Sequence, residues 1–271
     1  AGTGGLNFWD LLYESTGGTS YYRNGGGTFH NITFNSATGR IHDGSTGNKV
    51  IFNQSGVIYN GTCTIDTVLF NGYANIETGG HTFGRVWMDG DGNIDGSNTF
   101  TDLLELTEGF TYEFDAGQTQ TFNGDLVAAG TCFNPINIQS SSSTQAIFSK
   151  TSGAITVTRV NLANMNATGG AAFTANASFD LGNNTGWTIN APAALDLYWV
   201  GGTGDWNDPT HWSYSSGGSS GACIPTVQDN VFFDDQSFSS TGQIVTLIGD
   251  ANGDAVCNDI DCTGVTNNPT L

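Results

Sequence analysis

The feature that most constrains the fold of this chain is a repeat of apolar residue pairs with a period of eighteen. Phe34, Phe52, Phe70, Met88 and Leu106 lie eighteen residues apart, and another apolar residue stands two positions before each. A spacing of two places both side chains of a pair on one face of a β-strand. The period is too short for leucine-rich or helical repeats and fits one coil of a β-solenoid, whose coils stack at about 4.8 Å. We therefore predict an all-β fold dominated by a β-solenoid (parallel β-helix) with about 18 residues per coil.

A polar column accompanies the apolar one. Asn35, Asn53 and Asn71 each follow directly after a pair, and Asp89 follows the next pair. Stacked amides at the bend of a coil can hydrogen-bond to one another and to the turn backbone. We predict that the three asparagines form a ladder with a structural role.

A second apolar column is expected in the other strand of each coil. Ile58, Ile76, Ile94 and Tyr112 recur at the same interval of eighteen. After about residue 118 the interval loosens, although alternating apolar pairs continue. We interpret these pairs as further coils with longer loops, which end near residue 189; they are Ile136 with Ile138, Ile155 with Val157, and Phe179 with Leu181.

A short connector containing Pro192 marks a boundary, because the composition beyond it shifts to Trp, Pro and Asp. We predict a solenoid over residues 1–190 and a smaller β-rich module over residues 196–271. Strands are expected in that module at 230–233 and 243–248.

Charge excludes several classes of partner. Asp and Glu number 25 against six Lys plus Arg, so the formal net charge is −19. Such a chain repels phosphate backbones and anionic lipid, which argues against nucleic acid and against membrane insertion. No run of about 18 apolar residues offers a membrane span. Divalent cations are better candidate ligands.

Two acidic runs are candidate Ca²⁺ sites, because oxygen ligands at alternate positions can converge on one hard cation. The first contains Asp89, Asp91 and Asp95, with Ile94 where a calcium loop needs glycine. The second, Asp250, Asn252 and Asp254, fits the ligand spacing better but has no closing glutamate. The alternatives are a plain turn and a polar hairpin.

The sequence contains few residue patterns that are typical of an enzyme active site. Asp234-Asp235 is the only adjacent acidic pair, and the six basic residues and four histidines are scattered. Glycan cleavage needs two carboxylates across a cleft, and no such constellation is assembled in the sequence. We predict no enzymatic activity. The alternative is a β-helix glycan-processing enzyme or a glycan-binding module.

The five cysteines form no metal-binding spacing. One disulfide in the last third, Cys223 with Cys257, is an open possibility, and the odd count argues against a dense disulfide scaffold.

Three tryptophans, Trp199, Trp206 and Trp212, are interleaved with Gly, Asp and Pro just after the connector. Read alone, they suggest stacking on sugars. Their position after the last coil instead predicts a structural joint, in which they cover the apolar cross-section at the end of the solenoid.

The segment Trp199-x-Gly-Gly-x-Gly-x-Trp206-x-x-Pro209-x-x-Trp212-Ser, followed by Asp229-Asn-Val-Phe-Phe-Asp234, resembles a module start of very large, repetitive bacterial surface proteins. These include autotransporter-like β-helix proteins and, most closely, the giant cell-surface adhesins of Bacteroidetes associated with gliding motility and type IX secretion. The tail 257–271 is similar to theirs. The resemblance covers the second module well and the solenoid only by pattern.

This resemblance implies a secreted, extracellular filament whose repeats extend a stalk for surface attachment or gliding. Its partners would be neighbouring copies in a tandem array, with Leu271 of one copy joined to Ala1 of the next, and surface glycans. It transfers no catalytic residue. A high charge of one sign would keep such a polymer soluble.

Overall fold

The computed structural model describes residues 7–14, 17–23, 25–247 and 255–271. The chain divides into two compact units, Ala1–Ala191 and Pro192–Leu271. The division falls within the connector that the sequence indicates. Each unit is described by itself below.

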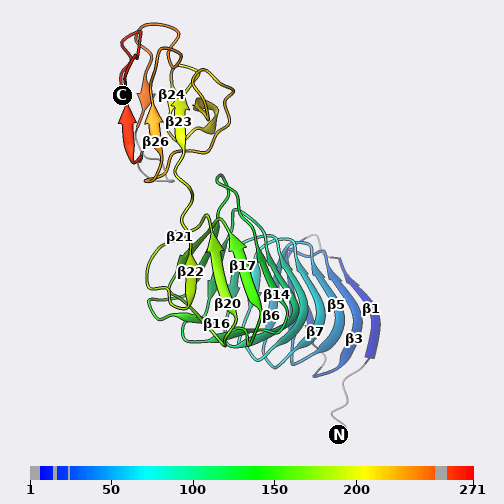
Figure 1. The fold of residues 1–271 in the computed structure, drawn as a ribbon. Coiled ribbons are helices and arrows are strands. Elements are labelled where there is room, and N and C mark those ends of the chain that lie inside the picture. Colours follow the sequence, from blue (N-terminus) through cyan, green and yellow to red (C-terminus); the bar gives the residue numbers. More distant parts are fainter. Residues whose placement is uncertain (1–6, 15–16, 24, 248–254) are drawn as a thin grey trace. The chain divides into compact units, whose positions relative to one another are not determined.

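The first unit is a β-solenoid of about ten turns, as the repeat predicts. Figure 1 shows its strands, blue to green, stacked as successive coils. All strand pairs of the first sheet are parallel. Its strands, in order, are β1 (Asn7–Tyr13), β3 (Thr28–Phe34), β5 (Thr46–Phe52), β7 (Thr64–Phe70), β9 (Thr82–Met88), β11 (Asn98–Leu106), β13 (Thr119–Phe122), β16 (Ala146–Ser149) and β19 (Met165–Thr168), with β14 (Asp125–Ala128) also paired to β11.

Two further parallel sheets close the coils. The second sheet holds β2 (Thr19–Arg23), β4 (Thr38–His42), β6 (Ser55–Tyr59), β8 (Ala74–Ile76), β10 (Gly92–Ile94), β12 (Thr111–Phe114), β15 (Ile136–Ser140), β18 (Val160–Ala163) and β21 (Phe179–Asp180). The third sheet holds β17 (Ala154–Thr158), β20 (Ala172–Asn176) and β22 (Trp187–Ile189).

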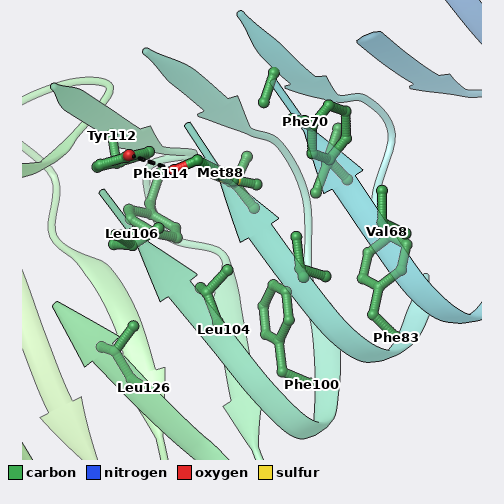
Figure 2. Packing of buried hydrophobic residues seen from close by; sticks show 14 of the residues in the cluster. Val68, Phe70, Phe83, Met88, Phe100, Leu104, Leu106, Tyr112, Phe114 and Leu126 are labelled. Carbon is green, nitrogen blue, oxygen red and sulfur yellow. Dashed lines mark hydrogen bonds between the residues drawn. The ribbon is translucent and has the colours of Figure 1, made fainter. Parts of the chain in front are cut away.

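The core of the solenoid consists of columns of like residues. The rings of Phe34 and Phe52 stack with centroids 5.2 Å apart, and those of Phe52 and Phe70 with centroids 4.9 Å apart. Each of these side chains is at most 1% exposed. Another column of the first sheet contains Phe83 and Phe100, and Figure 2 shows residues of both columns at the later coils. Each buried Phe contributes about 1.5–3 kcal/mol, so the stacked columns are the main source of stability.

The second apolar column continues differently from the prediction. Ile58, Ile76 and Ile94 are aligned in neighbouring strands, but Phe114 takes the next place and Tyr112 pairs with Gly92. Two extra residues between β10 and β12 shift the register. The hydroxyl of Tyr112 donates to the carbonyl oxygen of Met88 at 2.9 Å, which satisfies the buried phenol (Figure 2).

The later pairs also separate. Ile136 and Ile138 lie in the second sheet, whereas Ile155 and Val157 lie in the third sheet, where Phe173 and Ala175 are their partners. The two pairs do not stack on each other, because the longer coils contain an additional strand, which belongs to the third sheet. The last strand, β22, ends at Ile189, where the sequence places the end of the solenoid.

The second unit contains a mixed four-stranded sheet and a two-stranded sheet. The order of the larger sheet is β25 (Trp212–Ser213), β23 (Asp196–Trp199), β26 (Asn230–Phe232) and β28 (Asp259–Asp261). The smaller sheet pairs β24 (Gly204–Asp205) with β27 (Val245–Thr246), and one 3₁₀ helix, η1 (Pro209–His211), precedes β25. The expected strands at 230–233 and 243–248 correspond to β26 and β27 within the described residues. No helix in the described parts of the chain is long and apolar enough to cross a membrane.

Candidate functional site

A groove of about 520 Å³ lies on the outer face of the first sheet and is the best candidate site. Its lining comes from β5, β7 and β9 and from the turns that follow β7, β9 and β11. We call it the Trp87 groove, and its lining residues are Lys49, Thr67, Leu69, Asn71, Trp87, Asp89 and Thr107.

Strand alternation exposes these side chains. Val68, Phe70, Val86 and Met88 fill the core, so the residues between them face outward. Leu69 lies directly beside Trp87 in the pairing of β7 with β9.

The Trp87 ring is held by a neighbouring coil. The next strand places Glu105 beside Trp87, and the indole Nε1–H of Trp87 donates to Glu105 Oε2 at 2.5 Å. This hydrogen bond fixes the ring while leaving the side chain half-buried. The groove therefore has an oriented aromatic ring at its apolar part.

The asparagine ladder supplies one rim of the groove. Asn53 Nδ2 donates to Asn35 Oδ1 at 2.6 Å, and Asn71 Nδ2 donates to Asn53 Oδ1 at 2.9 Å. The eighteen-residue spacing predicts these bonds. Asn71 also lines the groove, with the exposed Asp89 in the next coil. The ladder thus ends where the groove presents amide, carboxylate and hydroxyl oxygens.

The chemistry of the Trp87 groove suits binding of a polar ring compound. An indole beside amide, hydroxyl and ammonium groups can contact the C–H face of a sugar and hydrogen-bond its hydroxyls. Among the described residues that line it, Asp89 is the single carboxylate. Glycoside hydrolysis by the usual route uses a pair.

The first predicted Ca²⁺ run does not assemble a cation site. Asp89 and Asp91 are exposed and Asp95 is half-buried, and Asp91 Oδ1 accepts a hydrogen bond from the Thr111 backbone N–H at 2.8 Å. The described residues include no group of three or more His, Cys, Asp or Glu that could hold a metal ion. The strand β10 separates Asp91 from Asp95, so the alternating spacing cannot form a loop around one cation. The second run, Asp250, Asn252 and Asp254, lies outside the described residues.

Asp95 belongs instead to an acidic corner of the solenoid. It lines a cavity of about 680 Å³ with Asp115 and the glycine-rich turns at 78–80 and 96–97. Burial raises the pKa of Asp95, and the nearby charges of Asp115, Glu77 and Glu113 raise that pKa further. The corner is a site of stacked like charge, which costs stability.

The three tryptophans lie in the hydrophobic core of the second unit, and a role at the joint with the solenoid stays a prediction. Trp199 and Trp212 are fully buried and Trp206 is 3% exposed, in a core that they share with Phe233 and other residues of the second unit. Trp199 Nε1–H donates to the Gly202 carbonyl oxygen at 2.7 Å. The three rings are the core of the second unit, because a unit this small needs large residues to fill its interior. They are buried, so they offer no stacking surface for sugars.

The adjacent carboxylates Asp234 and Asp235 follow a strand of the second unit and shape a turn. Asp234 Oδ1 accepts the backbone N–H of Gln236 at 2.9 Å, and Asp235 Oδ1 accepts from the Gln236 side chain. They do not face each other across a cleft.

The cysteines correct the predicted pairing. Cys63, Cys257 and Cys262 are free thiols, whereas Cys132 and Cys223 are each disulfide-bonded. The Cys223–Cys257 pairing that the sequence left open does not form, because Cys257 is a free thiol. Sequence spacing gives no distance between sulfur atoms. Disulfides persist in oxidising compartments, which indicates a location outside the cytoplasm.

Sequence reasoning missed the Trp87 groove. Its signal was the residue between the two members of each apolar pair, which is itself apolar in Ile51, Leu69 and Trp87. A row of outward-facing apolar residues on one face of a solenoid indicates a surface that binds a ligand or a partner.

Comparison with known protein families, characterised proteins and solved structures finds no match for this chain.

Proposed function

We propose that this chain is a structural and adhesive repeat of a secreted bacterial cell-surface filament, with the solenoid as its stalk. The observation that carries the proposal is the unbroken column of stacked coils in the first unit. A solenoid is quasi-one-dimensional, so it lengthens by adding coils without redesigning a core. The resemblance of the segment 199–234 to giant Bacteroidetes adhesins of gliding motility and type IX secretion supports this assignment.

The partners in this proposal are neighbouring copies of the same chain. The formal net charge of −19 on each copy keeps copies apart along a filament and keeps the filament soluble. The proposal assigns no reaction to the chain.

Joining two copies, Leu271 to Ala1, tests the stalk. We expect the tandem protein to be monomeric and folded, with the same unfolding midpoint as one copy and a longer maximum dimension in small-angle X-ray scattering. A tandem protein that aggregates, or that unfolds at a lower temperature than one copy, would contradict the array.

A second candidate function, glycan binding, is favoured by the Trp87 groove. Binding of neutral oligosaccharides to the purified chain, lost in Trp87→Ala and retained in the outward-facing Thr33→Ala, would support it. Equal binding by the two variants would remove the groove from consideration.

A further inference from the structure

A second surface of the solenoid carries chemistry that neither the stalk nor the Trp87 groove uses. It lies on the outer face of β2, β4 and β6, in the second sheet. We call it the arginine–tyrosine patch, and it consists of Tyr21, Arg23, Arg40, His42 and Tyr59.

The strand register brings these side chains together. Tyr21 pairs with Arg40, and His42 lies between Arg23 and Tyr59. Their chain neighbours Tyr22, Ile41 and Ile58 belong to the core, so the patch residues face away from it.

The patch has a covered floor and an open rim. His42 is only 3% exposed although it faces outward, and the Tyr59 ring packs edge-on against it with centroids 4.9 Å apart. Tyr21 is 46% exposed, and Arg23 is exposed beside it. A ligand can therefore reach the rim, which Tyr21 and Arg23 form, with polar side chains directly behind it.

Two buried atoms of the patch, Arg40 Nε and His42 Nε2, have no hydrogen-bond partner among the residues that the structure describes. A guanidinium Nε–H is always a donor, and leaving a donor buried without an acceptor is costly. The second, independent feature is charge. The Cζ atoms of Arg23 and Arg40 lie 5.2 and 5.9 Å from the centroid of the Tyr21 ring, and neither guanidinium has an ion pair among the described residues.

Two acidic residues lie close to the patch. Asp43 follows His42 in the chain, and Glu77 lies beyond Tyr59, in line with the end of β8. The side formed by Arg23 and Arg40 is the side on which an anion would meet two positive charges.

We propose that the arginine–tyrosine patch binds the anionic group, carboxylate or sulfate, of a single acidic sugar residue within an otherwise neutral glycan. The two guanidiniums supply charge-assisted hydrogen bonds, and the exposed Tyr21 ring supplies an apolar surface for the sugar. The chain as a whole repels polyanions, whereas charges beyond about 8 Å are largely screened at physiological salt. The electrostatic attraction of a single acidic group to the patch is therefore stronger than its repulsion by the distant negative charges of the chain.

This inference rests on the proposed adhesive function for its role at the cell surface. The binding itself is tested on the single purified chain, so it can fail while the tandem protein still behaves as a stalk, and the reverse also holds.

The test is a titration of the chain with a trisaccharide that ends in glucuronic acid and is otherwise neutral. Three comparison ligands are the methyl ester of that trisaccharide, its sulfate-ester counterpart, and a peptide whose single charge is one glutamate. We expect the ester to bind at least about tenfold more weakly than the acid, because a charged hydrogen-bond acceptor is lost. The tighter of the carboxylate and sulfate ligands identifies the source of the anion.

Arg23→Gln and Arg40→Gln should each weaken binding of the acid about tenfold or more. Arg85→Gln removes the same charge from an exposed ion pair with Asp102 on the first sheet and should bind as the unsubstituted chain does. Arg23 is exposed, so its variant tests the patch even if Arg40→Gln lowers stability. Equal binding of acid and ester, equal binding by the Arg23 and Arg85 variants, or a peptide that binds as tightly as the saccharide would overturn the proposal.

Discussion

At the residue scale, His81 shows how this solenoid uses a polar side chain inside its wall. It is 1% exposed, and its Nδ1 accepts a hydrogen bond from the Cys63 backbone N–H at 3.0 Å. Its Nε2–H then donates to the Glu77 carbonyl oxygen at 2.9 Å. These bonds require the neutral imidazole, and burial lowers the pKa of His81.

Because the folded pKa of His81 is lower than the unfolded value of about 6.5, the unfolded chain binds a proton more readily. The contribution of His81 to stability is complete above pH 6.5 and decreases as pH falls below it. We expect His81→Leu to lower the free energy of unfolding at pH 7.5 by about 1–3 kcal/mol, since the Cys63 N–H loses its acceptor. Between pH 7.5 and pH 5.5, the free energy of unfolding of His81→Leu should decrease less than that of the unsubstituted chain.

Urea unfolding at the two pH values measures this difference. His30→Gln is the control, because it removes a histidine side chain that is substantially exposed, and it should lower the free energy of unfolding at pH 7.5 less than His81→Leu does. An undiminished loss of stability in His81→Leu would contradict the assignment.

At the element scale, the phenylalanine column depends on a matching column of small residues. Gly39, Gly56, Ala74 and Gly92 are aligned in neighbouring strands of the second sheet. A Cβ atom at Gly56 would lie 2.3 Å from Cγ of Phe52. The two sheets can approach only because one column is large and the other is small.

Gly56→Ala should therefore destabilise the solenoid by about 1–3 kcal/mol through overpacking. Thermal unfolding followed by circular dichroism measures the effect. Gly17→Ala adds the same methyl group where nothing lies within 4 Å and should change the midpoint little. An unchanged unfolding midpoint in Gly56→Ala would show that the core can accommodate the added methyl group without strain.

The asparagine ladder is a polar column that stacks along the solenoid in the same way as the phenylalanine column. Asn53 both donates to Asn35 and accepts from Asn71. Asn53→Ala removes both bonds, and we expect a loss of about 1–2 kcal/mol in the free energy of unfolding, at roughly 1 kcal/mol per bond. Gln54→Ala truncates an exposed neighbour in the same turn and should have a small effect. Similar losses in the two variants would argue against a ladder contribution.

At the scale of the whole molecule, two separate hydrophobic clusters, one in each unit, predict two unfolding events. Trp206 belongs to the smaller cluster, with ring contacts to Trp212 and Phe233. Trp206→Ala should cost the second unit about 3–5 kcal/mol while the solenoid keeps its own transition.

Limited proteolysis with mass spectrometry checks this prediction. Cleavage sites should appear within residues 192–271 and leave a resistant fragment of the solenoid. Val227→Ala changes a residue that is 61% exposed and should leave the protease pattern unchanged. Loss of the solenoid fragment in Trp206→Ala would show that the two cores unfold together.

The solenoid can be predicted from the amino-acid sequence alone, because its core repeats. Phe34, Phe52 and Phe70 recur at a fixed interval, so a single spacing gives strand direction, coil length and stacking partner, and the following asparagines give the ladder. The division into two units is visible for the same reason, since the repeat ends where the composition changes. The change of register at Tyr112 is not visible, because two inserted residues leave the alternation intact.

The positions of side chains outside the repeat follow from the folded chain and not from the sequence pattern. The Trp87 groove needs four successive coils side by side, and the arginine–tyrosine patch joins residues of three strands that are separate in the chain. The burial of Trp199, Trp206 and Trp212 depends on which core they complete, and the state of each cysteine depends on distances between sulfur atoms. Periodicity fixes contacts between equivalent positions of successive coils, whereas contacts between unlike positions are set by the packing of the whole chain.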